Sequence, residues 1–441
     1  MSPLPLLTSA PGVWVPLHGV GTRQDLPLPF SLVVVGAVAV LVVTFVVALR
    51  LWSRPRWQTA AGPPLPRLTR LVDHPAVVWT GRLVVLAVAG VGQVALWFGA
   101  DLDRNPFPGL LFVWVWVGLV PVSLLLGAVW RRFSVVRLLM AWRGALRADE
   151  PLPQWGLWPA ALALVAFGYL ELVQPDRTHL SVLRWWFLIW LVWVAGGALA
   201  FGGRWIASAD PFEAYATLVS RFSPWQRIDG VLHVVNPLRH LASSRPHRGT
   251  WAVGAALIGV TLFDSLGSST AWVQTVQSSD RPPQLWSGLG LLALVAIAVG
   301  LYLLGATALE TTTRTGEGAL VNRLGVSLVP IAVGYTFAHY ASYLVLEGQR
   351  VAVNLSDPLS RGQDWFGTAT LGVDAGLVDH PTLMAWNQVM GIVLGHVMAV
   401  LVAHDLAVRW LPTSGTARGQ LPLLVVMVAY TCGGLLLLFA G

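Results

Sequence analysis

The chain has 441 residues, of which 55% are hydrophobic and only 11% are charged. A soluble domain of this length could not cover so much apolar surface, so the composition indicates a protein that crosses a membrane many times. The single cysteine, Cys432, excludes a disulfide within the chain and a cysteine-rich metal site. All 28 basic residues are arginines, and the net charge of +7 would suit an acidic partner unless membrane topology explains it.

Ten apolar runs are each long enough to cross about 30 Å of hydrocarbon. The first five fall within residues 29–202 and the last five within 251–441. We expect the N-terminal segment (1–28) to be extracytoplasmic and the connection between the two groups (203–250) to be cytoplasmic, for the reason given below. The fold class expected is therefore an all-α polytopic membrane protein, with helices at residues 30–52, 78–100, 109–130, 155–173, 182–202, 251–272, 285–309, 321–346, 383–410 and 421–440.

The arginines are divided unequally between the two sides of this bundle. Alternate connections, starting with the one that follows the first helix, hold 17 arginines, whereas the opposite set, which includes the long loop 347–381, holds six. Because arginine-rich connections remain on the cytoplasmic side, we expect both termini outside a cell membrane. The positive charge then reflects topology, so we expect the lipid bilayer as a partner and no nucleic acid.

Two of the inner segments have amphipathic patterns. Residues 133–146 form one, and residues 209–225 form the other, which opens with Asp210 as a helix N-cap followed by Pro211 at the first helical position. Amphipathic helices between membrane spans are typical of the membrane interface. We therefore expect both segments to lie along the inner membrane surface.

Chemistry in this chain must come from polar residues inside the helices, because the sequence contains no phosphate-binding loop, nucleophile elbow or zinc-protease motif. Such residues are costly in a bilayer and are functional candidates by default. Asp264, His339 and His396 lie on three helices at similar expected depth, so we expect them to converge. Glu347, about 12 Å beyond His339 along its helix, is expected at the outer mouth of the site.

A structural role for the same side chains is an open alternative, since buried polar groups also join helices by hydrogen bonds. Gly391 and Gly395 belong to a stripe of small residues that predicts close packing of the ninth helix on a neighbour. His404–Asp405 beside Arg409 is typical of an inner-face helix cap. Roles stay open for three residues: His18, Glu171 and His404.

Several segments resemble one family of bacterial multi-pass membrane proteins, whose members commonly carry the label fenitrothion hydrolase. The resemblance runs nearly end to end and includes "HGVGTRQDLPLPF", "WPAALALVAFGYLELVQPDR", "DPFEAYATLVSRFSPW", "AHYASYLVLEGQ" and "GHVMAVLVAHDLAVR". It implies hydrolysis of an aryl phosphorothioate triester, a hydrophobic small molecule that partitions into the bilayer. The resemblance brings no established catalytic residues with it.

Hydrolysis of such an ester requires an activated water, usually supplied by a metal ion held by histidine and carboxylate side chains. Asp264, His339 and His396 could hold one divalent ion, such as zinc, with an open position. In this hypothesis His339 is a metal ligand or general base, and Glu347 assists at the mouth.

Three other functions would use the same residues. A transporter or metal-handling protein would bind an ion or solute in transit at the three side chains. A redox subunit would use His339 and His396 as axial ligands of a b-type haem. In a purely structural subunit, the polar network would only join helices.

Overall fold

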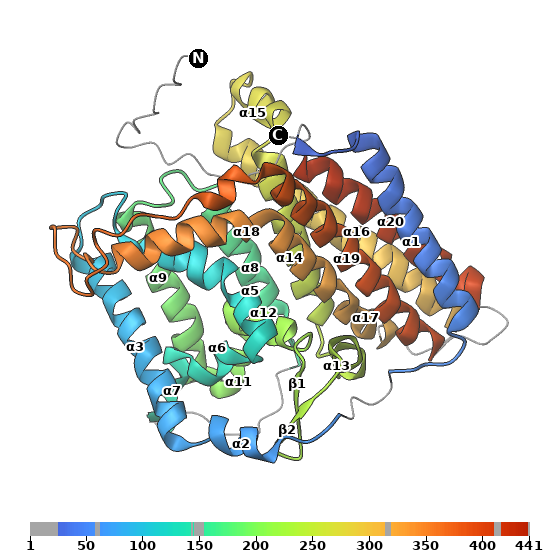
Figure 1. Ribbon diagram of the computed structural model, residues 1–441, viewed down its shortest axis with the longest axis horizontal. Coiled ribbons are helices and arrows are strands. Elements are labelled where there is room, and N and C mark those ends of the chain that lie inside the picture. Colours follow the sequence, from blue (N-terminus) through green and yellow to red (C-terminus); the bar gives the residue numbers. More distant parts are fainter. Residues whose placement is uncertain are drawn as a thin grey trace.

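The computed structural model describes residues 25–57, 62–142, 144, 154–313, 319–409 and 416–439, and most of these are helical (Figure 1). The strands of this part of the chain form a single antiparallel hairpin, made of β1 (Trp225–Ile228) and β2 (Val231–Val234). The architecture is that of an all-α membrane protein.

Eight helical stretches within the described residues are long and apolar enough to cross a membrane. Two of them are composite: Leu180–Phe201 contains α9, the π-helical segment η3 and α10, and Leu320–Asn354 contains α17, a 3-10 turn (η4) and α18. The elements concerned are α1 (Phe30–Leu51), α3 (Pro75–Phe98), α9 (Leu180–Leu191), η3 (Val192–Gly196), α10 (Gly197–Phe201), α14 (Thr250–Gly267), α16 (Pro283–Thr313), α17 (Ala319–Leu324), η4 (Gly325–Ser327), α18 (Leu328–Asn354), α19 (Pro381–Val408) and α20 (Thr416–Leu438).

The remaining two apolar runs are helical but irregular. The run at 109–130 is broken into α4 (Pro106–Gly109), the π-helical segment η2 (Leu110–Val117) and α5 (Leu119–Leu126), with a bend of 44° at Gly118. The run at 155–173 forms α8 (Trp158–Leu172), whose 15 residues are short for a span. Ten spans with both termini outside therefore stay a prediction.

Short helices and the hairpin connect these stretches. Figure 1 shows α2, the hairpin and α13 together at one end of the molecule, where Asp73 joins Arg132 and Arg227 at 2.9 and 2.7 Å. The hydrogen bond from Arg227 is the main reason that the pKa of Asp73 lies below its usual value. These shorter elements are α2 (Pro66–Val72), α6 (Val129–Phe133), α7 (Val135–Trp142), α11 (Gly203–Ala209), α12 (Pro211–Ser220), α13 (Pro237–Ser243), α15 (Thr270–Gln277) and η5 (Gly376–Asp379).

The expectation that α12 lies on the membrane surface is wrong. Its N-cap is as predicted, because Asp210 accepts a hydrogen bond from the Phe212 N–H at 3.1 Å. Nine of its ten residues are nevertheless buried in the protein, and the Tyr215 hydroxyl donates at 2.9 Å to the carbonyl of Trp116, in the middle of the broken helix. A helix covered on all sides by protein cannot rest an apolar face on lipid. The segment instead enters the bundle.

An ion pair holds α12 in this position. Both oxygens of Glu213 accept hydrogen bonds from the guanidinium of Arg137 on α7, one of them at 2.5 Å. Only 1% of the Glu213 side chain is exposed, so removal of Arg137 would leave a buried charge without its partner. Such a loss typically costs about 3–5 kcal/mol, which makes the pair the main polar constraint on α12.

The closest helix contact lies between α18 and α19, which run antiparallel. A Cβ atom on Gly334 would lie 2.3 Å from the carbonyl oxygen of Gly391, and one on Gly395 would lie 2.6 Å from that of Pro330. Further out, the Asn387 side chain donates to the Phe337 carbonyl at 2.7 Å. Small residues at these positions let the two backbones touch, as the stripe on the ninth helix predicts.

This seam predicts that Gly334→Ala destabilises the protein. Alanine normally improves a helix by up to about 1 kcal/mol relative to glycine, but the added methyl group would force the helices apart, at a cost of about 1–3 kcal/mol. Gly300→Ala on α16 is the matched control, because a Cβ there meets nothing within 4 Å. Thermal unfolding of the purified protein should show a lower Tm for Gly334→Ala and an equal or higher Tm for Gly300→Ala. A Gly334→Ala variant at least as stable as the wild type would contradict the seam.

The topology can be tested with two leucine-to-cysteine variants in a Cys432→Ser background. Leu71 is exposed on α2, and Leu371 is exposed in the loop before α19. We expect a membrane-impermeant maleimide to label Leu371→Cys in intact cells and Leu71→Cys only after permeabilisation. The reverse pattern would overturn the orientation that the arginines predict.

Candidate functional site

The polar centre of the bundle is the carboxyl group of Asp264, near the end of α14. One of its oxygens lies 2.9 Å from His339 Nε2 and also accepts a hydrogen bond from the Tyr340 hydroxyl at 2.6 Å. Only 4% of Asp264 is exposed. Two consecutive residues of α18 thus hold one buried carboxyl group, so Asp264 and His339 are in direct contact, as their expected depth predicts.

Aromatic rings enclose His339. The Tyr335 ring stacks on the imidazole, with centroids 5.5 Å apart, and the Tyr340 ring meets it edge-on at 4.6 Å. The Tyr335 hydroxyl donates to the Thr261 carbonyl at 2.7 Å and is also hydrogen-bonded to the Ser265 hydroxyl. The network therefore fixes the imidazole between α14 and α18.

His396 does not contact this pair. Its Nδ1 is hydrogen-bonded to the Ile392 carbonyl at 2.8 Å, and its buried Nε2 has no hydrogen-bond partner among the described residues. The neighbouring Gly395 packs against Pro330, nine residues before His339, which corresponds to about 13 Å along α18 at 1.5 Å per residue. The structure thus brings together two of the three predicted residues and places the third apart from them.

This arrangement does not fit a metal ion held by all three side chains. Within the part of the chain that the structure describes, no three His, Cys, Asp or Glu side chains form a group that could hold a metal. A haem between His339 and His396 does not fit either. Nε2 of His339 faces Asp264, and the backbone contact of Gly334 with Gly391 leaves no slot between α18 and α19 for a macrocycle.

The other candidates have local partners. Glu347 lies on α18, which extends to Asn354 rather than ending near residue 346, and it is buried and 2.9 Å from the guanidinium of Arg350. His18 lies outside the described residues. The proposed part of Glu347 in catalysis stays a prediction.

At the C-terminal end of α19, Asp405 has a structural role. Its carboxylate accepts hydrogen bonds from the Trp52 indole at 3.0 Å, from the Arg56 N–H at 2.6 Å and from Arg409 at 2.9 Å. The adjacent His404 bonds to the Trp52 carbonyl at 3.0 Å and to the Gln420 side chain at 2.8 Å. These contacts support the interpretation of His404–Asp405 as an inner-face cap, which here ties the segment after α1 to α19.

A cavity of about 340 Å³ lies beside the polar centre, between the C-terminal end of α8, the middle of α18 and the start of the broken helix. Glu171 lines it, with 8% of its surface exposed and with Oε2 lacking a hydrogen-bond partner among the described residues. Arg177 lines it nearer the solvent, and Tyr340 and Tyr343 form the wall on α18. The sequence singled out Glu171 without a role and gave no sign of Arg177 or the tyrosines.

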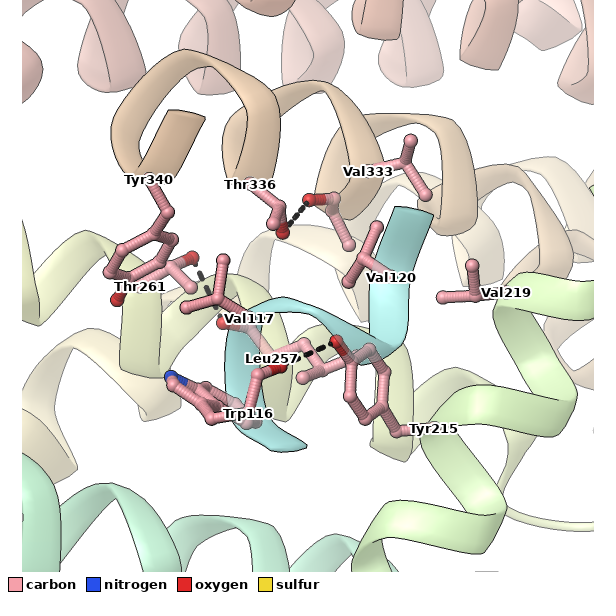
Figure 2. A pocket seen from close by; sticks show the side chains of 11 residues that line it. Trp116, Val117, Val120, Tyr215, Val219, Leu257, Thr261, Val333, Thr336 and Tyr340 are labelled. Carbon is pink, nitrogen blue, oxygen red and sulfur yellow. Dashed lines mark hydrogen bonds between the residues drawn. The ribbon is translucent and has the colours of Figure 1, made fainter. Parts of the chain in front are cut away.

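A second, smaller cavity lies deeper in the bundle (Figure 2). Its volume is about 20 Å³, which is enough for one water molecule. Figure 2 shows Tyr215 of α12, Trp116 of the broken helix, Thr261 of α14 and Thr336 of α18 around it, with Tyr340 at one end. Tyr340 therefore lines both cavities while its hydroxyl binds Asp264.

Comparisons with known proteins add no identification: no protein-family model matches the chain, and no curated protein or solved structure matches it either. The resemblance to proteins labelled fenitrothion hydrolase stays a prediction, so function must be argued from the site.

The buried network predicts that Tyr340→Phe lowers the free energy of unfolding by about 1–3 kcal/mol, because the buried carboxyl group of Asp264 loses a hydrogen-bond donor. Tyr169→Phe on α8 is the control, since its ring is exposed. Thermal unfolding in detergent should separate the two variants by about 1–3 °C. Equal melting temperatures would show that the Tyr340–Asp264 bond contributes little.

Proposed function

We propose that this protein is a proton-coupled transporter of the cell membrane. In this proposal a small solute enters the outer cavity beside Glu171, and a proton binds at the network of Asp264, His339 and Tyr340. The observation that carries the proposal is the position of Tyr340, which lines both cavities and donates a hydrogen bond to the carboxyl group of Asp264.

The network links protonation to movement of a side chain. A charged Asp264 holds the Tyr340 hydroxyl by a charge-assisted hydrogen bond, which is roughly twice as strong as a neutral one. The ring then separates the two cavities. Protonation of Asp264 weakens this bond, so the ring turns away and the cavities join. His339 supplies a second partner to Asp264 and can accept or return the proton.

Irregular backbone beside the cavities supports transport. Helices are tolerated in broken form at membrane depth only where they are buried in protein or line a cavity. Both conditions hold here, since the broken helix (α4, η2 and α5) lines both cavities and α12 lines the deeper one. Discontinuous helices around a site at mid-membrane depth are typical of secondary transporters.

The metal-dependent hydrolase that the resemblance implies remains a competing prediction. It would use the same outer cavity for a hydrophobic ester, but the described side chains do not supply the three ligands that its metal ion needs. A transporter requires only a solute cavity and a titratable group beside it. The described geometry therefore favours transport.

Proteoliposomes that contain a pH-sensitive dye test the proposal. Inward gradients of alkali cations, amines, amino acids and aryl phosphotriesters would be applied in turn, and the product of ester hydrolysis would be measured in parallel. We expect at least one solute class to change the internal pH, and Asp264→Asn to slow that change about tenfold or more, because an amide cannot carry the proton.

The control variant is Asp280→Asn, an exposed acid in the connection between α15 and α16 that lines neither cavity. It should behave like the wild type. If no solute class moves protons, or if Asp264→Asn is as fast as the wild type, the transporter proposal fails. Release of phenol from fenitrothion without proton movement would favour the hydrolase instead.

A further inference from the structure

The outer cavity contains a buried acid that the polar network does not use. Glu171 lies in the last turn of α8, and its Oε2 has no hydrogen-bond donor among the described residues. A buried carboxylate oxygen without a hydrogen-bond donor is costly, and Glu171 interacts electrostatically with the Asp264 carboxyl group as well as with Arg177. Two such groups favour either a shared proton or a bound cation.

The walls of the cavity indicate what kind of cation fits. Phe112, Tyr340 and Tyr343 present aromatic rings, which attract organic ammonium groups through their faces. Pro108, Leu172 and Pro175 add apolar surface. A bare metal ion would need several oxygen or nitrogen ligands, and the described residues do not group three such side chains here. A volume of about 340 Å³ lies within the range of small-molecule sites.

We propose that this cavity binds the ammonium group of a small organic amine, with Glu171 as its counter-ion and Tyr340 and Tyr343 as the aromatic wall. The apolar body of the amine lies against the proline and leucine side chains. The inference deepens the proposed function by naming the solute class, and it rests on that function only for the movement of the amine, not for its binding.

Arg177 adds a second possible contact. It lines the same cavity, is less buried than Glu171, and makes no described hydrogen bond or ion pair. A simple amine would leave it untouched, whereas the carboxylate of an amino acid could reach it while the ammonium group meets Glu171. The other titratable groups that interact electrostatically with the Glu171 carboxyl group are Asp264, Arg177, Tyr215, Tyr340 and Tyr343.

Equilibrium binding to the full-length protein in detergent tests the inference without any gradient. The probes are phenethylamine, its neutral analogue 2-phenylethanol, and phenylalanine, and binding is measured by calorimetry near neutral pH. We expect phenethylamine to bind about tenfold or more tightly than the alcohol, because only the amine is charged. Glu171→Gln, which keeps the shape of the side chain, should remove that preference, whereas Asp280→Asn should keep it.

Two variants of the aromatic wall guard against a folding artefact. Tyr343→Phe keeps the ring and should retain binding, while Tyr343→Leu removes the ring and should weaken phenethylamine several-fold. If phenylalanine binds as tightly as the amine, and Arg177→Gln weakens phenylalanine alone, the solute is an amino acid. If phenylalanine binds more weakly than phenethylamine, the solute is a simple amine.

The inference is overturned if neither charged probe binds, if amine and alcohol bind equally, or if Glu171→Gln binds phenethylamine as the wild type does. Failure of the transporter proposal would look different. Amines would then bind in a Glu171-dependent way, yet move no protons across proteoliposomes. Conversely, proton movement driven by other solutes, without amine binding, would leave transport standing and remove the amine.

Discussion

A carboxyl group in hydrocarbon has no water to bond, and this constraint organises the centre of the protein. Asp264 is buried on α14, so its partners must come from neighbouring helices. His339 and Tyr340 supply them from one turn of α18, and Tyr335 then fixes the imidazole from the turn before. The position of α18 against α14 is therefore set by a polar requirement as well as by packing. Tyr340 also lines both cavities.

The same constraint explains how the short helix α12 can lie inside the bundle. Two acids lie at the start of α12, and each accepts a hydrogen bond from a neighbouring element. The Trp130 indole donates to Asp210 at 2.9 Å, and Arg137 pairs with Glu213. Tyr215 then bonds to a carbonyl of the broken helix. With its polar groups satisfied, α12 can line the deeper cavity beside the π-helical segment.

Much of this fold could be predicted from the sequence, because long apolar runs report hydrocarbon thickness directly. The contact of Asp264 with His339 was also predictable, since depth along two helices was enough to align them. His396 could not be placed in this way: depth counted from the ends of apolar runs assumed that α18 and α19 lie level, whereas Gly334 packs beside Gly391 and Pro330 beside Gly395, which offsets His396 from His339. Rotation and register of packed helices come from contacts such as those of Gly334 and Gly395, which the sequence alone does not pair.

For α12 and Glu171, too, the structure differs from the sequence prediction because the sequence does not show which residues pack together. An amphipathic pattern fits both a membrane surface and a buried site that satisfies a few polar groups, so the sequence of α12 predicted the commoner case. Glu171 drew attention only as an acid in an apolar helix, because Tyr340 and Tyr343 are remote from it in sequence and form its cavity only after folding.

The central claim is that Asp264 exchanges a proton within the bundle. Infrared difference spectroscopy of the membrane-reconstituted protein, recorded as the external pH is changed, measures this directly, because a carboxyl group and a carboxylate absorb at different frequencies. The account predicts a carboxyl band that changes with pH in the wild type and is absent from the spectrum of Asp264→Asn. Identical difference spectra for the two proteins would show that Asp264 keeps one protonation state and would contradict the claim.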